Sequence, residues 1–413
     1  MKKLLILGAG TGGTIMANKM YKTLPKKEWE ITVVDQDKKH YYQPGFLFIP
    51  FGTYKKKDVI KPKSDFFPKG VNVIYTEVEK INHADNHIIL KGDKKMEYDY
   101  LILATGTRSA PCETPGLKGE RWYKEVFDFY TIEGCTALAD YFKTWEGGKL
   151  VVNVVEMPFK CPVAPLEFVF LADAFFTKKG IRNKVEITYV TPLPGAFTKP
   201  IATKMLSELM EEKNIKIVPD FAIMEVDNDT KEIVDYAEQR IPFDCLVSIP
   251  TNMGVDLIEN SGMGDDLNFI PTDKHTLQAK VAENIFVIGD ASDVPASKAG
   301  SVAHFEAEVI AENLECAIKG KEFSAKFDGH ANCYIETGFG KGTLIDFNYE
   351  IEPTTGTYPI PKVGPFKLLK VTRMNHWGKL AFKWIYWNML LKAREMFIGH
   401  DLQLSGKDIE KKK

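Results

Sequence analysis

The hydrophobic pattern at the start of the chain predicts a strand, a glycine-rich turn, a helix and a second strand. Residues 3–7 are a short hydrophobic run, the turn Gly8-Ala9-Gly10-Thr11-Gly12-Gly13 follows, and hydrophobic positions then recur at helical spacing from residue 15 to 20. A second run, residues 31–34, ends in Asp35. This order of elements is that of the first half of a mononucleotide-binding unit.

The glycines have the spacing that a dinucleotide-binding turn needs. Gly8 permits the tight turn, Gly10 lets the backbone approach a pyrophosphate, and Gly13 lets helix and strand pack closely. Thr11 stands at the helix N-terminus, whose free N–H groups attract phosphates. Asp35 lies about 20 residues beyond the glycines, where an acid accepts hydrogen bonds from a ribose. These five residues predict a dinucleotide site.

The strand pattern repeats in the middle of the chain. Hydrophobic runs at residues 148–155, 185–190 and 243–250 follow the runs near residues 3, 31 and 98 at an offset of about 145 to 155 residues. Residues 285–288, which end in Gly289-Asp290, predict one more buried strand that completes the first unit. We therefore expect two copies of one unit.

The predicted fold class is α/β, with two Rossmann-like dinucleotide-binding domains, the second inserted in the first, plus a C-terminal amphipathic membrane-binding segment. The length of 413 residues suits two to three domains with cores of their own. We assign residues 1–147 and 251–325 to the first domain, 148–250 to the second, and 326–413 to a C-terminal region.

The two units differ at the turn after their first strand. Where the second unit should carry glycines, residues 156–165 read Glu-Met-Pro-Phe-Lys-Cys-Pro-Val-Ala-Pro, with three prolines and no glycine. Proline supplies neither the N–H donors nor the positive φ angles that a pyrophosphate turn requires. We expect the second nucleotide site to be inactive, with Cys161 in its place.

Composition excludes several classes of protein. The hydrophobic fraction of 44%, the charged fraction of 27% and the formal net charge of -2 argue against a dedicated nucleic-acid binder. No run of about 18 hydrophobic residues is present to span a bilayer, and no signal peptide precedes the first strand. The six cysteines include no C-x-x-C pair. We therefore expect neither a zinc site nor a disulfide scaffold.

Aromatic residues and cations dominate the C-terminal stretch from residue 366 to 397. Apolar residues recur at helical spacing at Trp377, Leu380, Ala381, Trp384, Trp387 and Leu391. The cations outnumber the single acid Glu395; they are Lys367, Lys370, Arg373, Lys379, Lys383, Lys392 and Arg394. A helix with aromatics on one face and lysines on the other is typical of the bilayer interface, and a core or dimer-interface helix is the alternative. We expect a peripheral or monotopic protein on the cell membrane, at its cytoplasmic face.

Three further motifs resemble those of a known family. Lys160-Cys161-Pro162-Val163-Ala164-Pro165-Leu166-Glu167 resembles the Lys-Cys-x-x-Ala-Pro-x-Glu motif of the sulfide:quinone oxidoreductases, which are membrane-surface flavoproteins of the two-dinucleotide-domain disulfide reductase superfamily. Tyr42-Gln43-Pro44 is typical of the quinone-linked and sulfide-linked branches, and Cys333 beside Tyr334 matches the second redox cysteine. The resemblance covers nearly the whole chain.

The resemblance implies FAD as the cofactor. In such flavoproteins a Gly-Asp like Gly289-Asp290 approaches the ribityl chain, and a small-residue turn like Thr105-Gly106 approaches the dinucleotide closely. Gln43 is expected near the far end of the cofactor. Lys298 precedes a predicted helix whose positive end faces the flavin, and is expected beside the polar edge of the ring.

The resemblance also implies the reaction, oxidation of sulfide to sulfur or polysulfide with transfer of two electrons through FAD to a quinone. Cys161 and Cys333 correspond to the redox pair, linked in the resting state by a disulfide or a sulfur bridge that sulfide attacks by thiol exchange. Glu167 is expected to act as general acid or base. Some members use a third cysteine, for which Cys112 and Cys135 are candidates; a two-cysteine site is our interpretation.

The expected partners are sulfide, a quinone of ubiquinone or menaquinone type, the membrane surface and a second copy of the chain. The quinone is expected to enter through the C-terminal region, where Tyr334, Phe339 and Lys298 are candidates to hold its ring. Two alternatives remain. A type II NAD(P)H:quinone oxidoreductase requires an intact second glycine turn, and a non-catalytic membrane-surface flavoprotein would bind flavin that sulfide does not reduce.

Overall fold

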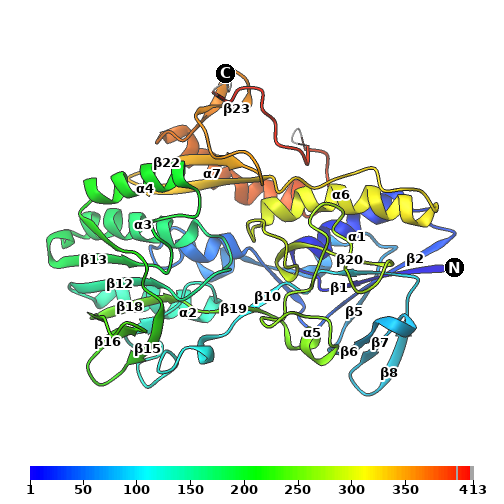
Figure 1. Ribbon diagram of the computed structural model, residues 1–413, viewed down its shortest axis with the longest axis horizontal. Coiled ribbons are helices and arrows are strands. Elements are labelled where there is room, and N and C mark those ends of the chain that lie inside the picture. The colour runs from blue at the N-terminus through cyan, green and yellow to red at the C-terminus, as the bar shows by residue number, and fades with distance from the viewer. Residues whose placement is uncertain (397–398, 410–413) are drawn as a thin grey trace.

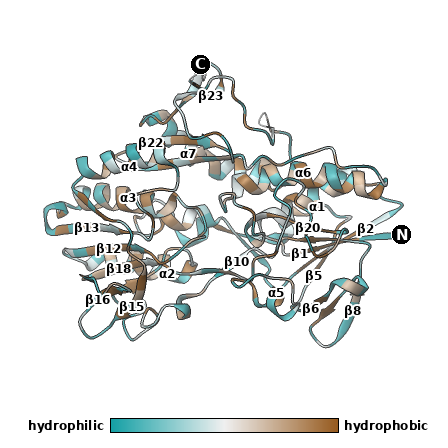
Figure 2. Cartoon of the chain, in the orientation of Figure 1, coloured by the Kyte–Doolittle hydropathy of each residue, from teal (hydrophilic) through white to brown (hydrophobic). Residues whose placement is uncertain are grey.

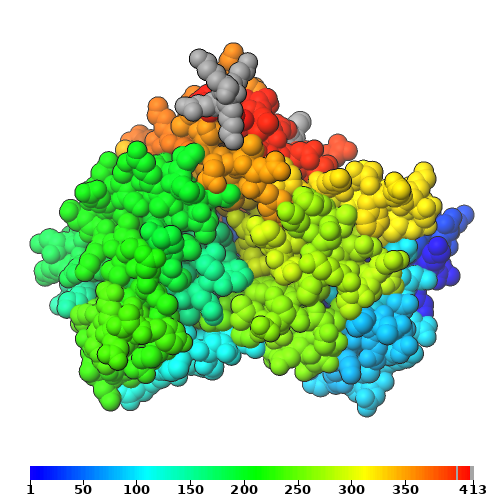
Figure 3. Space-filling model, in the orientation of Figure 1, coloured from blue at the N-terminus to red at the C-terminus, as the bar shows by residue number. Residues whose placement is uncertain are grey.

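The computed structural model describes residues 1–396 and 399–409, which form two α/β lobes with a C-terminal segment lying across both (Figure 1). The predicted C-terminal region 326–413 therefore includes residues 397, 398 and 410–413, among them Phe397 of the predicted tail, that lie outside the described residues. In Figure 3 the C-terminal residues, orange to red, cover the top of both lobes. No helix among the described residues is long and apolar enough to cross a bilayer.

A five-stranded parallel sheet forms the first lobe, in the order β20-β9-β1-β2-β5. Its strands are β1 Lys2–Leu7, β2 Trp29–Asp35, β5 Asn72–Tyr75, β9 Tyr100–Leu103 and β20 Ile285–Val287. Helices α1 (Thr11–Thr23) and α6 (Gly300–Ile318) pack against one another on one face. The strands β6 Val78–Asn82, β7 His87–Leu90 and β8 Lys94–Glu97 form a separate antiparallel sheet.

Side-chain alternation along β1 explains the two cores of this lobe. Leu4 and Ile6 belong to the large core that includes residues of α1 and α6, whereas Leu5 and Leu7 belong to a second core with residues of β6 and β7. Both faces of a parallel sheet must be covered, which is why its strands read as nearly continuous hydrophobic runs. Figure 2 shows hydrophobic colour on the strands and both colours on the helices that cover them.

The second lobe repeats this architecture. Its parallel sheet has the order β11-β18-β12-β13-β14, with β11 Val126–Phe127, β12 Gly148–Val154, β13 Val185–Val190, β14 Ile215–Val218 and β18 Cys245–Ile249. Strands β12, β13 and β18 take the places that β1, β2 and β9 take in the first sheet. Its helices are α2 Ile132–Thr144, α3 Ala164–Lys179 and α4 Pro200–Glu212, and the strands β15 Ile223–Asp227, β16 Glu232–Asp235 and β17 Arg240–Pro242 pair beside it. Because β11 joins this sheet, the predicted boundary at residue 147 lies too late.

The remaining elements connect the lobes or form the C-terminal segment. A ribbon of β10 Thr107–Ser109 and β19 Asn252–Gly254 runs between the lobes, β3 Lys39–Tyr41 pairs with β4 Ile60–Pro62, and α5 spans Asp256–Asn260. The segment that contains Cys333 forms two antiparallel strands, β21 Ala331–Gly338 and β22 Lys341–Phe347. They pair in the order β21-β22-β24-β23 with β23 Gly356–Ile360 and β24 Gly364–Leu368, and α7 (Arg373–Ile385) packs on β21 and β22.

The C-terminal stretch is not one amphipathic helix. Helix α7 ends at Ile385 and a π-helical turn, Tyr386–Leu390, follows it. A π-turn changes the number of residues per turn and so rotates the residues after it relative to a regular helical face. Trp377 and Trp384 are 63% and 61% exposed, but Trp387 is only 3% exposed. The prediction that Trp387 and Leu391 share the exposed face is therefore wrong, because both are buried.

Candidate active site

The glycine turn between β1 and α1 has the shape predicted for a pyrophosphate site. Gly8 has a φ of +96°, and a Cβ there would overlap the carbonyl oxygen of Ala104. A Cβ at Gly13 would overlap the carbonyl oxygen of Gly8, so Gly13 sets the close approach of helix and turn. A Cβ at Gly10 would meet no protein atom. Gly10 lines the cavity instead, so its bare backbone is open toward a ligand.

Asp35 is fixed at the end of β2 beside this turn. Its Oδ2 accepts a hydrogen bond from the backbone N–H of Ala9 at 2.6 Å, and its Oδ1 lies 2.7 Å from Nζ of Lys63. Both side chains of the ion pair are largely buried. Protein contacts alone thus hold the glycine turn and Asp35 together, in the arrangement that ribose and pyrophosphate require.

One cavity joins the glycine turn to the second lobe and the C-terminal segment. Of the predicted cofactor residues, all but Gly13 line it: Gly8, Gly10, Thr11, Asp35, Gln43, Thr105, Gly106, Gly289, Asp290 and Lys298. Cys161, Glu167, Lys379 and Tyr386 line the same cavity. The first residues of α1 and α6, Thr11 and Gly300, both reach it.

The residues around this cavity fit FAD. Two helix N-termini meet at one cavity, as a dinucleotide with a central pyrophosphate requires. The hydroxyls of Thr105 and Thr107 are buried without a hydrogen-bond partner in the described part of the chain. Buried polar groups are normally paired, so these two hydroxyls are available to a polar ligand.

Cys161 stands where the second lobe would hold its own nucleotide turn. It follows β12 and precedes α3, and its φ of 46° is in the left-handed region that a residue other than glycine seldom adopts. Its N–H donates to the carbonyl oxygen of Lys298 at 2.8 Å, and its own carbonyl accepts from Ala164. Strain of this kind persists only where neighbours enforce it, and it is common at functional sites.

Glu167 and Lys379 form a buried ion pair at the free edge of β21. Nζ of Lys379 lies 2.8 Å from Oε1 of Glu167 and donates to the carbonyl oxygen of Tyr334 at 3.0 Å. Oε1 of Glu167 accepts the N–H of Glu336 at 2.9 Å. Since β21 is the outermost strand of its sheet, the ion pair satisfies backbone groups that have no strand partner on that side.

This ion pair is the main charge near both predicted redox cysteines. Burial raises the pKa of the Cys161 thiol to about 11, although the Lys379 ammonium opposes the shift. Burial and the neighbouring Cys161 raise the pKa of Cys333 as well, again against Lys379. Although burial disfavours its charge, Glu167 and Cys161 hold the pKa of Lys379 above its usual value. Cys161, Glu167 and Lys379 line the cavity, whereas Cys333 is buried on β21 and does not line it; both thiols are unbridged.

The two lysines predicted or implied near the flavin hold the wall of the cavity. Nζ of Lys298 donates to the carbonyl oxygens of Asp290 and Ser292 at 3.0 and 2.7 Å. Nζ of Lys160 donates to the carbonyl oxygen of Thr107 at 3.0 Å and lies 3.8 Å from Oδ2 of Asp290. The Lys298 ammonium therefore fixes the Asp290 turn within the first lobe, and the Lys160 ammonium links that turn to the second lobe.

The other predicted residues differ in how deeply they are buried and in whether they lie near the cavity. Tyr334 lies on β21 with its ring edge-on to Phe366, 5.4 Å between centroids, beneath α7. Phe339 is 56% exposed at the turn after β21, with Nζ of Lys213 over its ring, and it does not line the cavity. Its predicted role in holding a quinone is therefore not supported. Cys135 is buried in α2 and Cys112 is exposed, so neither joins the two cysteines.

Sequence reasoning missed two residues that the tail brings to the cavity. Lys379 was assigned to the lipid-facing cations, but its side chain is only 11% exposed. The hydroxyl of Tyr386 is hydrogen-bonded to Oγ1 of Thr11 at 2.8 Å and to Nε2 of His40 at 2.7 Å. Lys379, Phe382 and Tyr386 recur at i, i+3 and i+7, so a second, inward stripe was present in the tail sequence.

The chain is similar to known proteins over most of its length. Residues 2–152 match the family described as pyridine nucleotide-disulphide oxidoreductase. The chain is 28% identical over 398 residues to a mitochondrial sulfide:quinone oxidoreductase of Dictyostelium discoideum, with 95% of this chain and 86% of the relative covered. It is 26% identical over 360 residues to a type II NADH:quinone oxidoreductase of Staphylococcus aureus, with 82% and 86% covered.

A solved structure has the same fold. The sulfide:quinone oxidoreductase from the hyperthermophilic bacterium Aquifex aeolicus matches with a TM-score of 0.80 and 18% identity, covering 95% of this chain and 92% of that chain. The predicted α/β fold and the resemblance to the sulfide:quinone oxidoreductases are confirmed. The described residues include no cluster of three or more His, Cys, Asp or Glu side chains placed to hold a metal ion.

Proposed function

We propose that this chain, an FAD-dependent oxidoreductase similar to the sulfide:quinone oxidoreductases over nearly its whole length, oxidises sulfide and passes two electrons to a membrane quinone. One observation carries the proposal. Cys161 occupies the turn where the second lobe would bind a nucleotide, and it lines the same cavity as the glycine turn of the first lobe. A thiol is therefore next to the cofactor where a pyridine nucleotide would otherwise be.

The alternative NADH:quinone reaction fits this turn less well. NADH needs backbone N–H donors at the end of β12, where residues 158, 162 and 165 are prolines. The carboxylate of Glu156 also lies there and accepts a hydrogen bond from the hydroxyl of Thr251. A fixed carboxylate at that position repels a pyrophosphate, so the sulfide reaction is the better match.

The sulfur chemistry belongs to Cys161 and Cys333. In the oxidised site HS⁻ attacks one sulfur of the bridge between them, which forms a persulfide on one cysteine and releases the other as a thiolate. The Lys379 ammonium stabilises that thiolate, and Glu167 keeps the ammonium in place. When bound, FAD accepts the electron pair and passes it to the quinone. Glu167 lines the same cavity as Cys161, and we assign to it the role of holding the proton of the persulfide.

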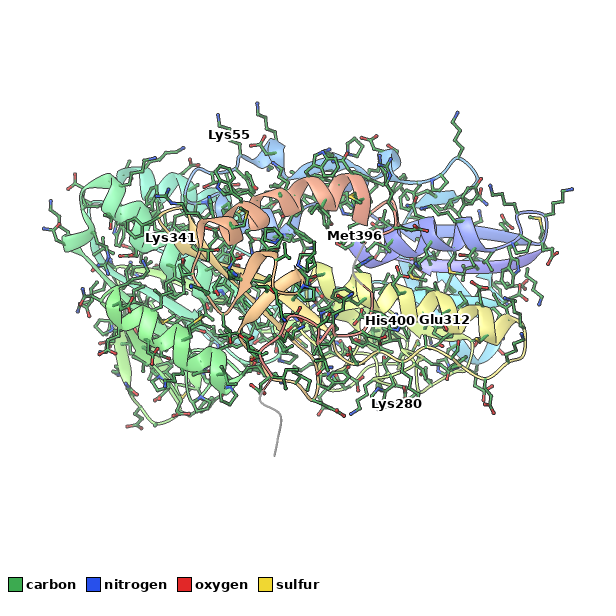
Figure 4. The ribbon with its side chains drawn as sticks, turned by 90° about the horizontal axis from the view of Figure 1, so that it is seen from above. Lys55, Lys280, Glu312, Lys341, Met396 and His400 are labelled. Atoms are coloured by element: carbon green, nitrogen blue, oxygen red, sulfur yellow. The ribbon has the colours of Figure 1, made fainter. Side chains whose placement is uncertain are left out.

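The face of α7 that points away from the site supports membrane attachment. Met374, Trp377 and Trp384 lie one turn or two turns apart and are exposed. Seen from above, α7 extends across the face between Lys341 and Met396 (Figure 4). Tryptophan at such a surface suits the bilayer interface, and we propose that this face binds the membrane through which quinone reaches Tyr334.

Vesicle binding tests the membrane proposal. The double variant Trp377→Ser/Trp384→Ser is expected to lose about tenfold or more in affinity for anionic vesicles, because two interfacial aromatic side chains are removed. Tyr236→Ser removes a similarly exposed aromatic from the second lobe and is the matched control. Equal vesicle binding by both variants would exclude α7 as the membrane contact.

The domain division and the homo-oligomer stay predictions. The return of β20 to the first sheet supports insertion of the second unit into the first. In this division the second unit begins at β11 instead of at residue 148. The cytoplasmic face and the type of quinone are part of the same proposal.

An anaerobic titration tests the reaction. Sulfide is added to the purified holoprotein while the visible flavin absorbance is followed, and a short-chain quinone is added last. The proposal expects bleaching by sulfide, no bleaching by NADH, and recovery on addition of quinone. Bleaching by NADH alone would establish the alternative reaction.

A further inference from the structure

Two acidic side chains and a histidine lead from the cavity to the outer surface of α7. Lys379 and Glu167 border the cavity. On the far side of this ion pair lies Glu336 of β21, whose side chain is 1% exposed. Both carboxylate oxygens of Glu336 are 2.9 Å from Nδ1 of His376, and the His376 side chain is 21% exposed. His376 is thus the most exposed member of this series.

The members of this series also interact electrostatically. Lys379 and His376 are three residues apart on α7, so they lie on the same side of the helix. The N–H of Glu336 donates to Glu167, and the negative charge of Glu336 favours the charged form of Lys379. Tyr54 faces Lys379 and Glu336 from the loop before β4 and completes the ionisable groups around Glu336.

Glu336 is suited to exchange protons near neutral pH. Burial raises the pKa of Glu336 to about 7, while the hydrogen bond from His376 opposes the shift. A group whose pKa lies near the working pH gives up and takes back a proton with little cost in either direction. An apolar side chain often stabilises a protein more than a buried ion pair does. The Glu336–His376 pair therefore indicates a role other than stability.

The proposed function creates a need for one proton from water. Oxidation of HS⁻ to sulfur releases two electrons and one proton, whereas reduction of a quinone Q to the quinol QH₂ consumes two electrons and two protons. The balanced reaction is HS⁻ + H⁺ + Q → S + QH₂. One proton per turnover must therefore reach the buried cavity from solvent.

We propose that His376 and Glu336 form the route by which this proton enters: it passes from solvent to His376, from His376 Nδ1 to the Glu336 carboxylate, and from there to the neighbouring Lys379–Glu167 pair at the cavity. This inference rests on the proposed function. It makes His376 and Glu336 necessary for the quinone half of the reaction and not for the sulfide half.

Stopped-flow mixing separates the two halves. Holoprotein is first bleached with one equivalent of sulfide, then mixed anaerobically with short-chain quinone in weak buffer that contains a pH-indicator dye. In the unmodified protein, one proton is expected to be taken up as the flavin absorbance recovers. In His376→Gln and Glu336→Gln, proton uptake and recovery are expected to slow together by about tenfold or more, with bleaching by sulfide unchanged.

Chemical rescue distinguishes proton transfer from a structural effect. Added imidazole is expected to restore the rate in His376→Gln, whose site is open to solvent, but not in the buried Glu336→Gln. Glu336→Asp is expected to recover part of the rate. The control is His275→Gln, because Nδ1 of His275 bonds only to the backbone carbonyl of Phe327, far along the chain from α7.

Each outcome has one meaning. Recovery at the unmodified rate in both variants, or equal slowing of the sulfide and quinone phases, overturns the route and leaves the proposed function intact. Absence of bleaching by sulfide in the unmodified protein overturns the proposed function and this inference with it.

Discussion

The turns after β1 and β12 occupy equivalent places in two sheets of equivalent strand order, yet they carry different residues. The first turn has three glycines at the fingerprint positions, and its open backbone faces the cavity at Gly10. The second turn has prolines in place of those glycines and holds Cys161 in a left-handed conformation beside α3. The comparison indicates that a few residues of one turn decide whether the same fold presents a phosphate-binding backbone or a cysteine thiol at that place.

The sharpest way to break this comparison is to remove the sulfur from the second turn. Cys161→Ser is expected to slow bleaching by sulfide about a thousandfold or more, because a hydroxyl replaces the nucleophile. FAD content should not change, because the glycine turn is intact. Cys112→Ser, at an exposed position, is the control and should react at the unmodified rate. Normal bleaching of Cys161→Ser would remove the second turn from the reaction.

A methyl group on the first turn tests the opposite half of the comparison. Gly10→Ala is expected to weaken FAD binding about a hundredfold, which corresponds to about 2.7 kcal/mol. The added Cβ meets no protein atom, so the thermal unfolding midpoint of the FAD-free protein should stay the same. A change at the start of α3, Pro165→Ala, should leave FAD affinity unaltered. Equal losses in both variants would mean that both turns bind the dinucleotide.

The electrostatics of the second turn depend on the C-terminal segment. With its pKa near 11, Cys161 is mostly protonated at neutral pH. Its alkylation rate should therefore rise about tenfold for each unit by which the pH is increased, until the pH reaches that pKa. Lys379→Gln removes the opposing cation and is expected to raise the pKa further and slow alkylation about tenfold at pH 8.

Two controls keep the Lys379 result specific. Lys379→Gln is compared with the Lys379→Gln/Glu167→Gln double variant, since an unpaired buried carboxylate by itself costs about 3 to 5 kcal/mol of stability. Because Glu167 raises the pKa of Cys161, the double variant should slow alkylation less than Lys379→Gln. Lys383→Gln, one turn along α7 with its ammonium 4.1 Å from the ring centroid of Tyr54, should leave alkylation unchanged. Equal alkylation rates in the unmodified protein, Lys379→Gln and Lys383→Gln would show that Lys379 does not act on the Cys161 thiol.

The smallest effect is expected at the turn after β21. Phe339→Ala should change the rate of flavin recovery by quinone less than about twofold, because the exposed ring lies outside the cavity and surface changes are usually near neutral. Stopped-flow absorbance measures this rate. A large loss would restore Phe339 as a quinone contact and place the quinone outside the cavity described here.

Local patterns predicted the first turn and the sheets well because their causes are local. Gly8, Gly10 and Gly13 are required by the turn itself, and hydrophobic runs mark strands wherever both faces of a sheet are covered. The motif around Cys161 was visible for the same reason. The strand order of both sheets then followed from the repeat.

Contacts across the chain were harder to predict. The inward position of Lys379 depends on Glu167, which is 212 residues earlier, and on the open edge of β21. The burial of Trp387 depends on a π-helical turn that the sequence pattern did not predict. Both errors came from reading the tail as a single helix with one apolar face, although Lys379 and Tyr386 defined a second.

The central claim is that sulfur from the substrate becomes attached at the second turn. Peptide mass spectrometry after anaerobic addition of one equivalent of sulfide, with free thiols blocked at once, tests this claim most directly. We predict one added sulfur atom on the peptide of Cys161 or Cys333, absent from Cys161→Ser and removed by reductant. Bleached flavin with no sulfur on either peptide would contradict the account, because the electrons would then have bypassed both cysteines.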